Sequence, residues 1–252
     1  MTERRSTHHE IEVPGTPEEV WEAIATGPGI SAWFMPTDVD GRTGGDAVFH
    51  LGAADVPATV TGWEPPARFA YEEPWREGAT LATEFLVEAR AGGTCVVRVV
   101  STFSEDGFGD DLEQIGSGWP AVLHNLRLYL THFRGRKAAA VSVTADSPAT
   151  TEAAWTELTS ALGLGQVQVG EAVAAEAAPL EGTVEVVGPD HVFVRSDDAL
   201  ASVTVFSWDD RTVAAVRETR FGPDAEADAE RDRLAWTAWM ERVIPSSAAR
   251  SA

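Results

Sequence analysis

The chain has 252 residues, 44% of them hydrophobic and 23% charged, which is typical of a folded protein of one or two domains. Its 40 acidic and 19 basic residues give a formal net charge of -21, so we expect no nucleic-acid or membrane partner. Apolar runs such as Ala138 to Val143 are far too short to cross a bilayer, and the polar segment Met1 to Arg5 lacks the apolar core of a signal peptide. Together these features favour the cytoplasm.

The first half opens with a strand and a helix. His8 to Val13 alternates between polar and apolar residues, which is the pattern of a half-buried strand. Thr16 and Pro17 predict a helix start, because threonine is a good N-cap and proline fits the first turn. Trp21 lies on the apolar face of this helix, and Ile30 to Phe34 predicts further helical turns.

After these helices the hydrophobic pattern changes to a period of two, which predicts a series of strands. They are expected at residues 46–51, 56–63, 68–73, 81–89 and 94–103. The connections are short and rich in glycine and proline, so the pattern favours hairpins in a meandering antiparallel sheet.

The last part of the first half contains an acidic segment and a helix. Ser104 to Gly118 is rich in glycine and acidic residues, and we interpret it as a solvated loop that serves as a lid over a cavity. Its acidic residues match no calcium-binding loop. Trp119 to Phe133 has a helical period, with its apolar residues on one face.

The second half repeats the same order of elements. Val141 to Thr144 alternates like the first strand, and Ser147-Pro148 repeats the helix start. Further strands are expected at residues 183–187, 191–195 and 212–221, and a last helix at 229–243. This repeat predicts a duplication, with a first domain at residues 1–136 and a divergent second copy at 141–252.

Several motifs of the first half carry a resemblance to a known superfamily. They are the string from Ile11 to Ile24, Gly44-Gly45 before a strand, the segment Pro65 to Tyr71, and Gly118-Trp119-Pro120 in the last helix of that half. Over residues 8–134 the chain resembles the SRPBCC (START/Bet v1-like) superfamily, in the branch named after the activator of Hsp90 ATPase. The second half is similar only in outline.

The resemblance implies an α+β fold of the helix-grip type, in two tandem copies. In this fold a curved antiparallel sheet wraps around a long C-terminal helix, with a cavity between them. Most members of the superfamily bind lipids, polyketides or other apolar molecules. Some relatives are cyclases or hydrolases, and some sequester reactive natural products for self-resistance. A co-chaperone-like interaction protein is a further alternative.

The chain has nine tryptophans but only two tyrosines. Tryptophan combines a large apolar area with one polar group, which suits the wall of a pocket, so the candidate ligand-binding residues are mostly aromatic. They are Trp33, Phe34, Phe49, His50, Trp63, Tyr71, Phe85, Phe103, Trp119 and Leu123. Each of them also has an interpretation as a core residue. The set predicts an apolar small-molecule ligand, held by buried apolar area and oriented by one or two polar groups.

The other polar residues form no recognised catalytic or cofactor motif. His50 and His124 are the acid–base candidates if the protein is an enzyme, and Arg98 and Arg127 could meet a ligand carboxylate, although surface ion pairs are the more ordinary role. Cys95 lies in an apolar strand and is expected to be packed rather than reactive. No spacing of histidines, cysteines or carboxylates predicts a metal site, and no cofactor is expected.

Two short segments resemble functional motifs, but their context argues against a nucleophile and against a dinucleotide-binding loop. Ser117 lies in Gly116-Ser117-Gly118, which lacks the strand–turn–helix setting of a nucleophile. Gly163-Leu164-Gly165 begins like a dinucleotide-binding loop, but Gln168 stands where the third glycine belongs.

Overall fold

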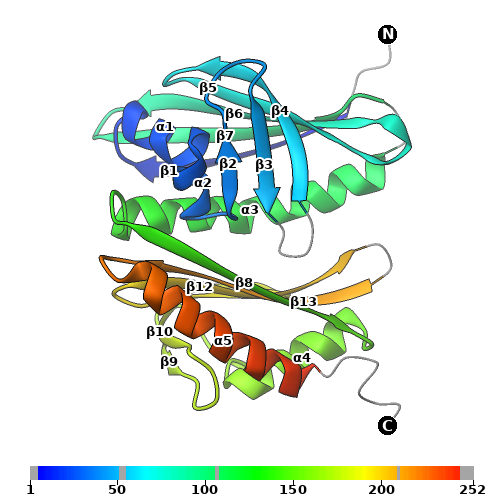
Figure 1. Cartoon of the computed structure of the whole chain (residues 1–252), viewed down its shortest axis with the longest axis vertical. Coiled ribbons are helices and arrows are strands. Elements are labelled where there is room, and N and C mark those ends of the chain that lie inside the picture. The colour runs from blue at the N-terminus through cyan, green and yellow to red at the C-terminus, as the bar shows by residue number, and fades with distance from the viewer. Residues whose placement is uncertain (1–4, 51–54, 106–107, 209–210, 245–252) are drawn as a thin grey trace. The chain divides into compact units, whose positions relative to one another are not determined.

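The computed structural model describes residues 5–50, 55–105, 108–208 and 211–244. The chain divides into two compact units, Met1–Gly135 and Arg136–Ala252. Each unit consists of one antiparallel sheet with helices packed on one of its faces (Figure 1). None of the helices within the described ranges has the length and apolar character that a membrane span requires.

The described residues of the first unit form a sheet of seven strands and three α-helices. In chain order its elements are β1 (Ser6–Pro14), α1 (Pro17–Ala25), α2 (Gly27–Ser31), β2 (Thr37–Val39), β3 (Asp46–His50), β4 (Asp55–Glu64), β5 (Arg68–Pro74), the short η1 (Arg76–Gly78), β6 (Thr80–Arg90), β7 (Thr94–Phe103) and α3 (Gly109–His132). The strand order is β1-β7-β6-β5-β4-β3-β2 and every pair is antiparallel. The expected meander is therefore present, with the first strand added beside the last.

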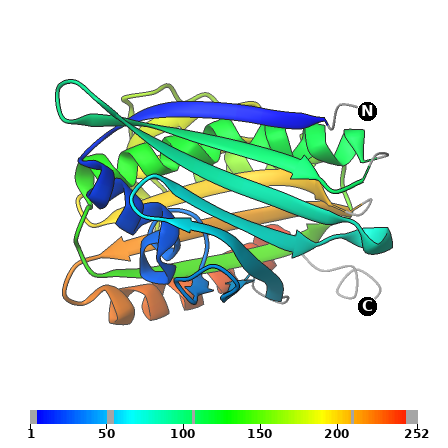
Figure 2. The ribbon, with the colours of Figure 1, turned by 90° about the horizontal axis from the view of Figure 1, so that it is seen from above.

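Helix α3 runs along the concave face of this sheet and packs on β1 and β7 (Figure 2). It begins at Gly109, inside the segment 104–118 for which the sequence predicted a loop, so that prediction is wrong over most of its length. Leu112, Gly116 and Trp119 follow one another at helical spacing and are buried. The burial of this face outweighs the low helix propensity of the glycines.

The acidic residues of that segment belong to the helix. Asp110 and Asp111 lie in the first turn of α3, where negative charge is favourable to the helix dipole, and Asp111 forms an ion pair with Arg76. Glu113 also lies in α3, and Asp106 falls outside the described residues. Asp110, Asp111 and Glu113 therefore belong to a helix and not to the free loop that was predicted as a lid.

Gly116 sets how closely α3 approaches the sheet. A Cβ atom at this position would lie 2.7 Å from Cγ2 of Thr7, on β1. Real Cβ atoms do not come so close to another carbon, so glycine allows the helix and the strand to touch.

The sheet of the second unit has the same strand topology, with one strand fewer among the described residues. Its elements are β8 (Ala138–Ser147), α4 (Thr151–Leu162), β9 (Ala172–Ala174), β10 (Glu181–Val187), β11 (His191–Arg195), β12 (Ala199–Trp208), β13 (Arg211–Phe221) and α5 (Ala225–Val243). The strand order is β8-β13-β12-β11-β10-β9, again antiparallel throughout. Two tandem copies of an α+β helix-grip fold are thus confirmed, and the strands described in the second copy include no counterpart of β2.

Three strands have no counterpart among the sequence-based predictions, namely β2, β9 and β12. Two of them have only three residues, and β12 has small residues such as Ala199 and Ala201 on the face where large apolar ones were sought. The predicted helix start at Ser147-Pro148 is also wrong. Ser147 ends β8, and the side chain of Thr150 caps α4 by accepting a hydrogen bond from the backbone of Ala153.

Candidate functional site

Aromatic rings form a continuous layer on the concave face of the first sheet. One series of ring contacts runs from Trp63 through Phe69 and Tyr71 to Phe49, with centroid distances of 5.9, 5.7 and 4.8 Å. Phe69 also stacks on Phe85 at 6.2 Å, which connects this series to the rings described next. The layer extends across β3, β4, β5 and β6.

A second series of rings crosses from the sheet to the helices. Phe85 meets Trp119 of α3 at 5.6 Å, Trp119 meets Phe34 at 5.9 Å, and Phe34 stacks on Trp33 at 5.6 Å. The indole nitrogen of Trp33 donates a hydrogen bond of 2.9 Å to the carbonyl of Ala23 in α1, which fixes that ring. Phe34 is partly exposed, whereas Trp33, Phe85 and Trp119 are buried.

Three of the ten sequence-predicted residues lie outside this layer. Phe103 belongs to a neighbouring cluster with Trp75 and Phe108, at 5.4 and 5.1 Å. Leu123 lies one turn beyond Trp119 on α3 and is buried. His50 alternates with the buried Phe49 and points to the other face of β3. There it contacts Asp55 at 2.7 Å and Asp38 at 3.1 Å, which raise the pKa of the imidazole.

A row of hydroxyl groups crosses the same concave face. In the strand registers Tyr71 pairs with Thr83, Thr83 with Ser101, and Ser101 with Thr7, so four neighbouring strands each place one hydroxyl in the row. The Tyr71 hydroxyl is hydrogen-bonded to Thr83, and Thr83 Oγ1 lies 3.5 Å from Ser101 Oγ. Burial raises the pKa of Tyr71 far above its ordinary value.

Helix α3 contacts this row through a hydrogen bond. The indole nitrogen of Trp119 donates a hydrogen bond of 3.1 Å to Ser101 Oγ, so the ring that links sheet and helix is anchored in the hydroxyl row. At the end of the row, Thr7 Oγ1 is buried and has no hydrogen-bond partner among the described residues. Each such buried hydroxyl costs free energy unless it is satisfied.

One carboxyl group lies next to the row. Glu73 follows Phe69 and Tyr71 at every second position of β5, which puts its side chain on the concave face, opposite Leu81 of β6. It forms no hydrogen bond or ion pair with any described residue, and burial alone raises its pKa to about 7. Glu73, Thr83, Ser101 and Thr7 were missed in the sequence analysis. The alternation of β5 was the signal that could have placed Glu73 among the aromatic residues.

A shallow pocket of about 300 Å³ lies on the opposite, outer face of this sheet. Its walls are Glu64, Ala67, Arg68, Leu86, Val87, Glu88, Val96 and Arg98. Arg68 is neutralised by Glu64 and Glu84, and Arg98 lies 3.2 Å from Glu10. Arg98, one of the two arginines considered for a ligand carboxylate, is therefore in a surface ion pair on the outer face.

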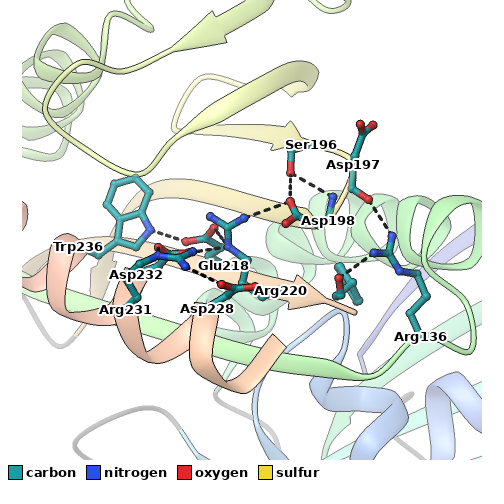
Figure 3. A network of polar contacts seen from close by, with 11 residues as sticks. Arg136, Ser196, Asp197, Asp198, Glu218, Arg220, Asp228, Arg231, Asp232 and Trp236 are labelled. Carbon is teal, nitrogen blue, oxygen red and sulfur yellow. Dashed lines mark hydrogen bonds and ion pairs between the residues drawn. The ribbon is translucent and has the colours of Figure 1, made fainter. Parts of the chain in front are cut away.

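The second unit carries a buried ionic network on its concave face (Figure 3). Arg220 of β13 lies 2.6 Å from Asp232 of α5, 2.9 Å from Glu218 and 3.1 Å from Asp198. The indole nitrogen of Trp236 donates a hydrogen bond of 2.6 Å to Glu218. Burial raises the pKa of Glu218, while Arg220 and Trp236 oppose that shift. Both buried carboxylates thus have a cation beside them, unlike Glu73.

The network continues to the surface of the unit. Arg231 forms ion pairs with Asp228 at 2.6 Å and with Asp232 at 3.1 Å, and Ser196 donates to Asp198 at 2.9 Å. Arg136 donates one hydrogen bond to the backbone carbonyl of Asp197 and another to that of Phe221 (Figure 3). These contacts tie α5 to β13 and to the turn before β12, so the interior of this unit is held by charges as well as by apolar packing.

The remaining candidates have ordinary structural roles. Cys95 is fully buried, its Sγ lies 3.4 Å from the carbonyl of Gly15, and burial raises its pKa, as expected for a packed thiol. Arg127 lies beside His124 on α3, away from the face that carries Trp119. Gly163 caps the end of α4 with a φ of 71°, which explains this glycine without a nucleotide. No cluster of three potential metal ligands occurs in the described parts of the chain.

Comparison with protein families matches residues 4–127 to the family described as polyketide cyclase / dehydrase and lipid transport. Comparison with curated proteins gives no match. The matched segment covers nearly all of the first unit. The branch named after the activator of Hsp90 ATPase stays a prediction.

Several solved structures are similar to the chain. The di-domain ARO/CYC protein BexL from the BE-7585A biosynthetic pathway is 11% identical, and the alignment covers 96% of this chain and 99% of that one, with a TM-score of 0.48. DynU16, a protein in the dynemicin biosynthetic locus, is 18% identical over 95% of this chain and 97% of that one, with a TM-score of 0.46. Protein MLL2253 from Mesorhizobium loti is 18% identical over 50% of this chain and 97% of that one, with a TM-score of 0.47.

Proposed function

Residues 4–127 form a domain of the SRPBCC superfamily, and on this premise we propose that the first unit binds an apolar, polycyclic or acyl molecule between its sheet and α3. The observation that carries the proposal is the aromatic layer with a row of hydroxyls beside it. Rings supply the apolar contact area, and a few fixed hydroxyls supply orientation, which is the usual composition of a small-molecule site.

The contact between Phe34 and Trp119 is our proposed entrance. Phe34 is the partly exposed member of the second ring series, and it meets Trp119 through ring contact alone. A ligand would enter by separating these two rings. Trp33 would stay in place, because its indole nitrogen is hydrogen-bonded to the carbonyl of Ala23. In the rest of the proposed site the ligand would contact Phe49, Tyr71, Phe85, Phe103 and Leu123, with Trp63 at the far end of the layer.

The second unit has a supporting role in this proposal. Its concave face is occupied by Trp236 and by the charges of Arg220, Glu218 and Asp232, which satisfy one another. An apolar ligand there would have to displace paired charges, which is costly. We therefore assign ligand binding to residues 1–136 and a structural role to the divergent copy at 141–252.

Native mass spectrometry of the purified full chain, with an organic extract of the denatured sample beside it, tests the proposal. We expect a discrete co-purified mass, or binding of the anthraquinone alizarin when it is added. Phe34→Ala should weaken this binding, and the control Leu86→Ala, in the outer pocket, should leave it unchanged. Loss of binding in Leu86→Ala alone would move the site to the outer face, and a chain that binds nothing would contradict the proposal.

A further inference from the structure

The two units differ in the carboxyl groups of their concave faces, which are buried in the second unit and partly buried at Glu73 of the first. In the second unit Glu218 and Asp232 are 2% and 3% exposed, and both lie within 3 Å of Arg220. In the first unit Glu73 has no cation and no hydrogen-bond donor among the described residues. A carboxyl group of the first kind is a structural ion pair. One of the second kind loses part of its hydration without gaining a partner, which disfavours its charged form.

The neighbours of Glu73 on this face of the sheet are mostly apolar or aromatic. Its register partner Leu81 packs with Phe103 and Leu112, and Tyr71 precedes it on the same face of β5. Trp75, two residues after Glu73, contacts Phe103 and belongs to the same cluster. Glu73 thus stands where the aromatic layer, the hydroxyl row and the Phe103 cluster meet.

From this placement we propose that Glu73 is the proton-transfer group of the ligand site in the first unit. Its ligands would be apolar molecules with an ionisable C–H or O–H group next to a carbonyl or an aromatic ring. The inference rests on the proposed ligand site and goes further by assigning it a chemistry. The Glu73 carboxylate accepts the proton, the electron pair stays on the ligand as an enolate or phenolate, and the same proton can return to another ligand atom.

The electrostatics agree with this role. A carboxyl group that titrates near neutral pH is present in both protonation states in the cell, which suits a group that both takes and gives a proton. Tyr71 interacts electrostatically with Glu73. Its burial raises the pKa of its hydroxyl, so Tyr71 stays protonated near neutral pH. Arg76, beyond the end of β5, is paired with Asp111 of α3.

The test uses 5-nitrobenzisoxazole, a flat apolar probe whose isoxazole ring opens when a base removes the C–H proton of that ring. Glu73 takes that proton, the C–H electron pair forms the nitrile, the N–O bond breaks, and the oxygen leaves as a coloured phenolate. Glu73 then releases the proton to water. We expect the full chain to accelerate this reaction over free acetate, with a rate that rises with pH to a midpoint near neutrality.

Two variants separate the chemistry from the binding. Glu73→Gln should bind the probe as the natural chain does, measured by quenching of tryptophan fluorescence, and should lose at least about 10-fold of the rate. Glu72→Gln changes the neighbouring exposed carboxylate on the outer face and should keep the full rate. Circular dichroism checks that both variants are folded.

Each outcome decides one claim. Binding with a rate that Glu73→Gln does not lower would overturn the role of Glu73 and leave the ligand site in place. A rate lost equally in Glu72→Gln would also overturn it, since the effect would then be one of overall charge. A natural chain that does not bind the probe contradicts the ligand site itself.

Discussion

The indole nitrogen of Trp236 lies 2.6 Å from a carboxylate oxygen of Glu218, and this hydrogen bond joins α5 to β13 inside the second unit. The first unit has a contact of the same kind, because Trp119 of α3 donates to Ser101 of β7 at 3.1 Å. In each copy a tryptophan of the last helix donates to a polar side chain of the last strand. The acceptor is a hydroxyl in one copy and a carboxylate in the other.

This difference gives the first prediction. Trp119→Phe removes a donor from a neutral hydroxyl and should cost about 1 kcal/mol of unfolding free energy beyond the change in ring packing. Trp236→Phe removes a donor from a buried carboxylate and should cost about 2–3 kcal/mol. Urea denaturation of both variants measures this difference, and equal losses would contradict our account of Glu218.

The second prediction concerns Glu73 and pH. Its pKa is raised from 4.5 to about 7, so the folded state favours the protonated form, and stability falls as the pH rises from about 4.5 to 7. Glu73→Gln keeps the shape without the charge, and should stabilise the chain by about 1–3 kcal/mol at about pH 8 and have little effect at about pH 4.

Denaturation midpoints at the two pH values, with Glu72→Gln beside it, check this prediction. Glu72 is exposed, so its replacement should change stability little at either pH. If Glu73→Gln were destabilising at high pH, the carboxylate would have a partner that compensates its burial, and it would be a structural group.

The third prediction concerns the ionic network of the second unit. Arg220→Met should destabilise the chain by about 3–5 kcal/mol, because it leaves Glu218 and Asp232 buried without a cation. Arg211→Met breaks the exposed ion pair with Asp146 and should cost at most about 1 kcal/mol. Thermal unfolding compares the two variants. A loss for Arg220→Met no larger than that for Arg211→Met would contradict the buried network.

The fourth prediction concerns two glycines of one helix. Gly116→Ala should destabilise the first unit by about 1–3 kcal/mol, since its Cβ atom would press on Thr7 and push α3 away from β1. Gly118→Ala meets no atom within 4 Å and should stabilise the helix by about 0.5–1 kcal/mol. Chemical denaturation tests the opposite signs, and a gain in both variants would show that the contact at Gly116 is loose.

Much of the fold follows from the hydrophobic period of the sequence. The strands from β3 to β7 were predicted within a few residues of their observed ends, because large residues alternate there with polar ones. The start of α3 was missed because the glycines and aspartates between Gly109 and Gly118 have low helix propensity, and the burial of Leu112 and Gly116 against the sheet favours a helix there. Such tertiary effects are absent from local patterns.

The candidate site could also be predicted only in part from the sequence. Aromatic residues such as Phe49 and Phe85 could be selected from the sequence, because large rings on the inner face of a sheet are conspicuous. The hydroxyl row could not, since Thr7, Thr83 and Ser101 come from distant segments and only the strand registers bring them together. His50 was selected for its neighbours in sequence, and the alternation of β3 turns it to the outer face.

The most direct test of the ligand site is a titration of the full chain with alizarin, observed through the indole N–H signals of its nine tryptophans in a nitrogen–proton correlation spectrum. Single replacements by phenylalanine assign the signals. We predict that the signals of Trp33 and Trp119 shift with a common saturation curve, while those of Trp236 and Trp239 stay in place. Shifts confined to Trp236 and Trp239, or no shift in any signal at the solubility limit of the probe, would contradict a ligand site on the concave face of the first unit.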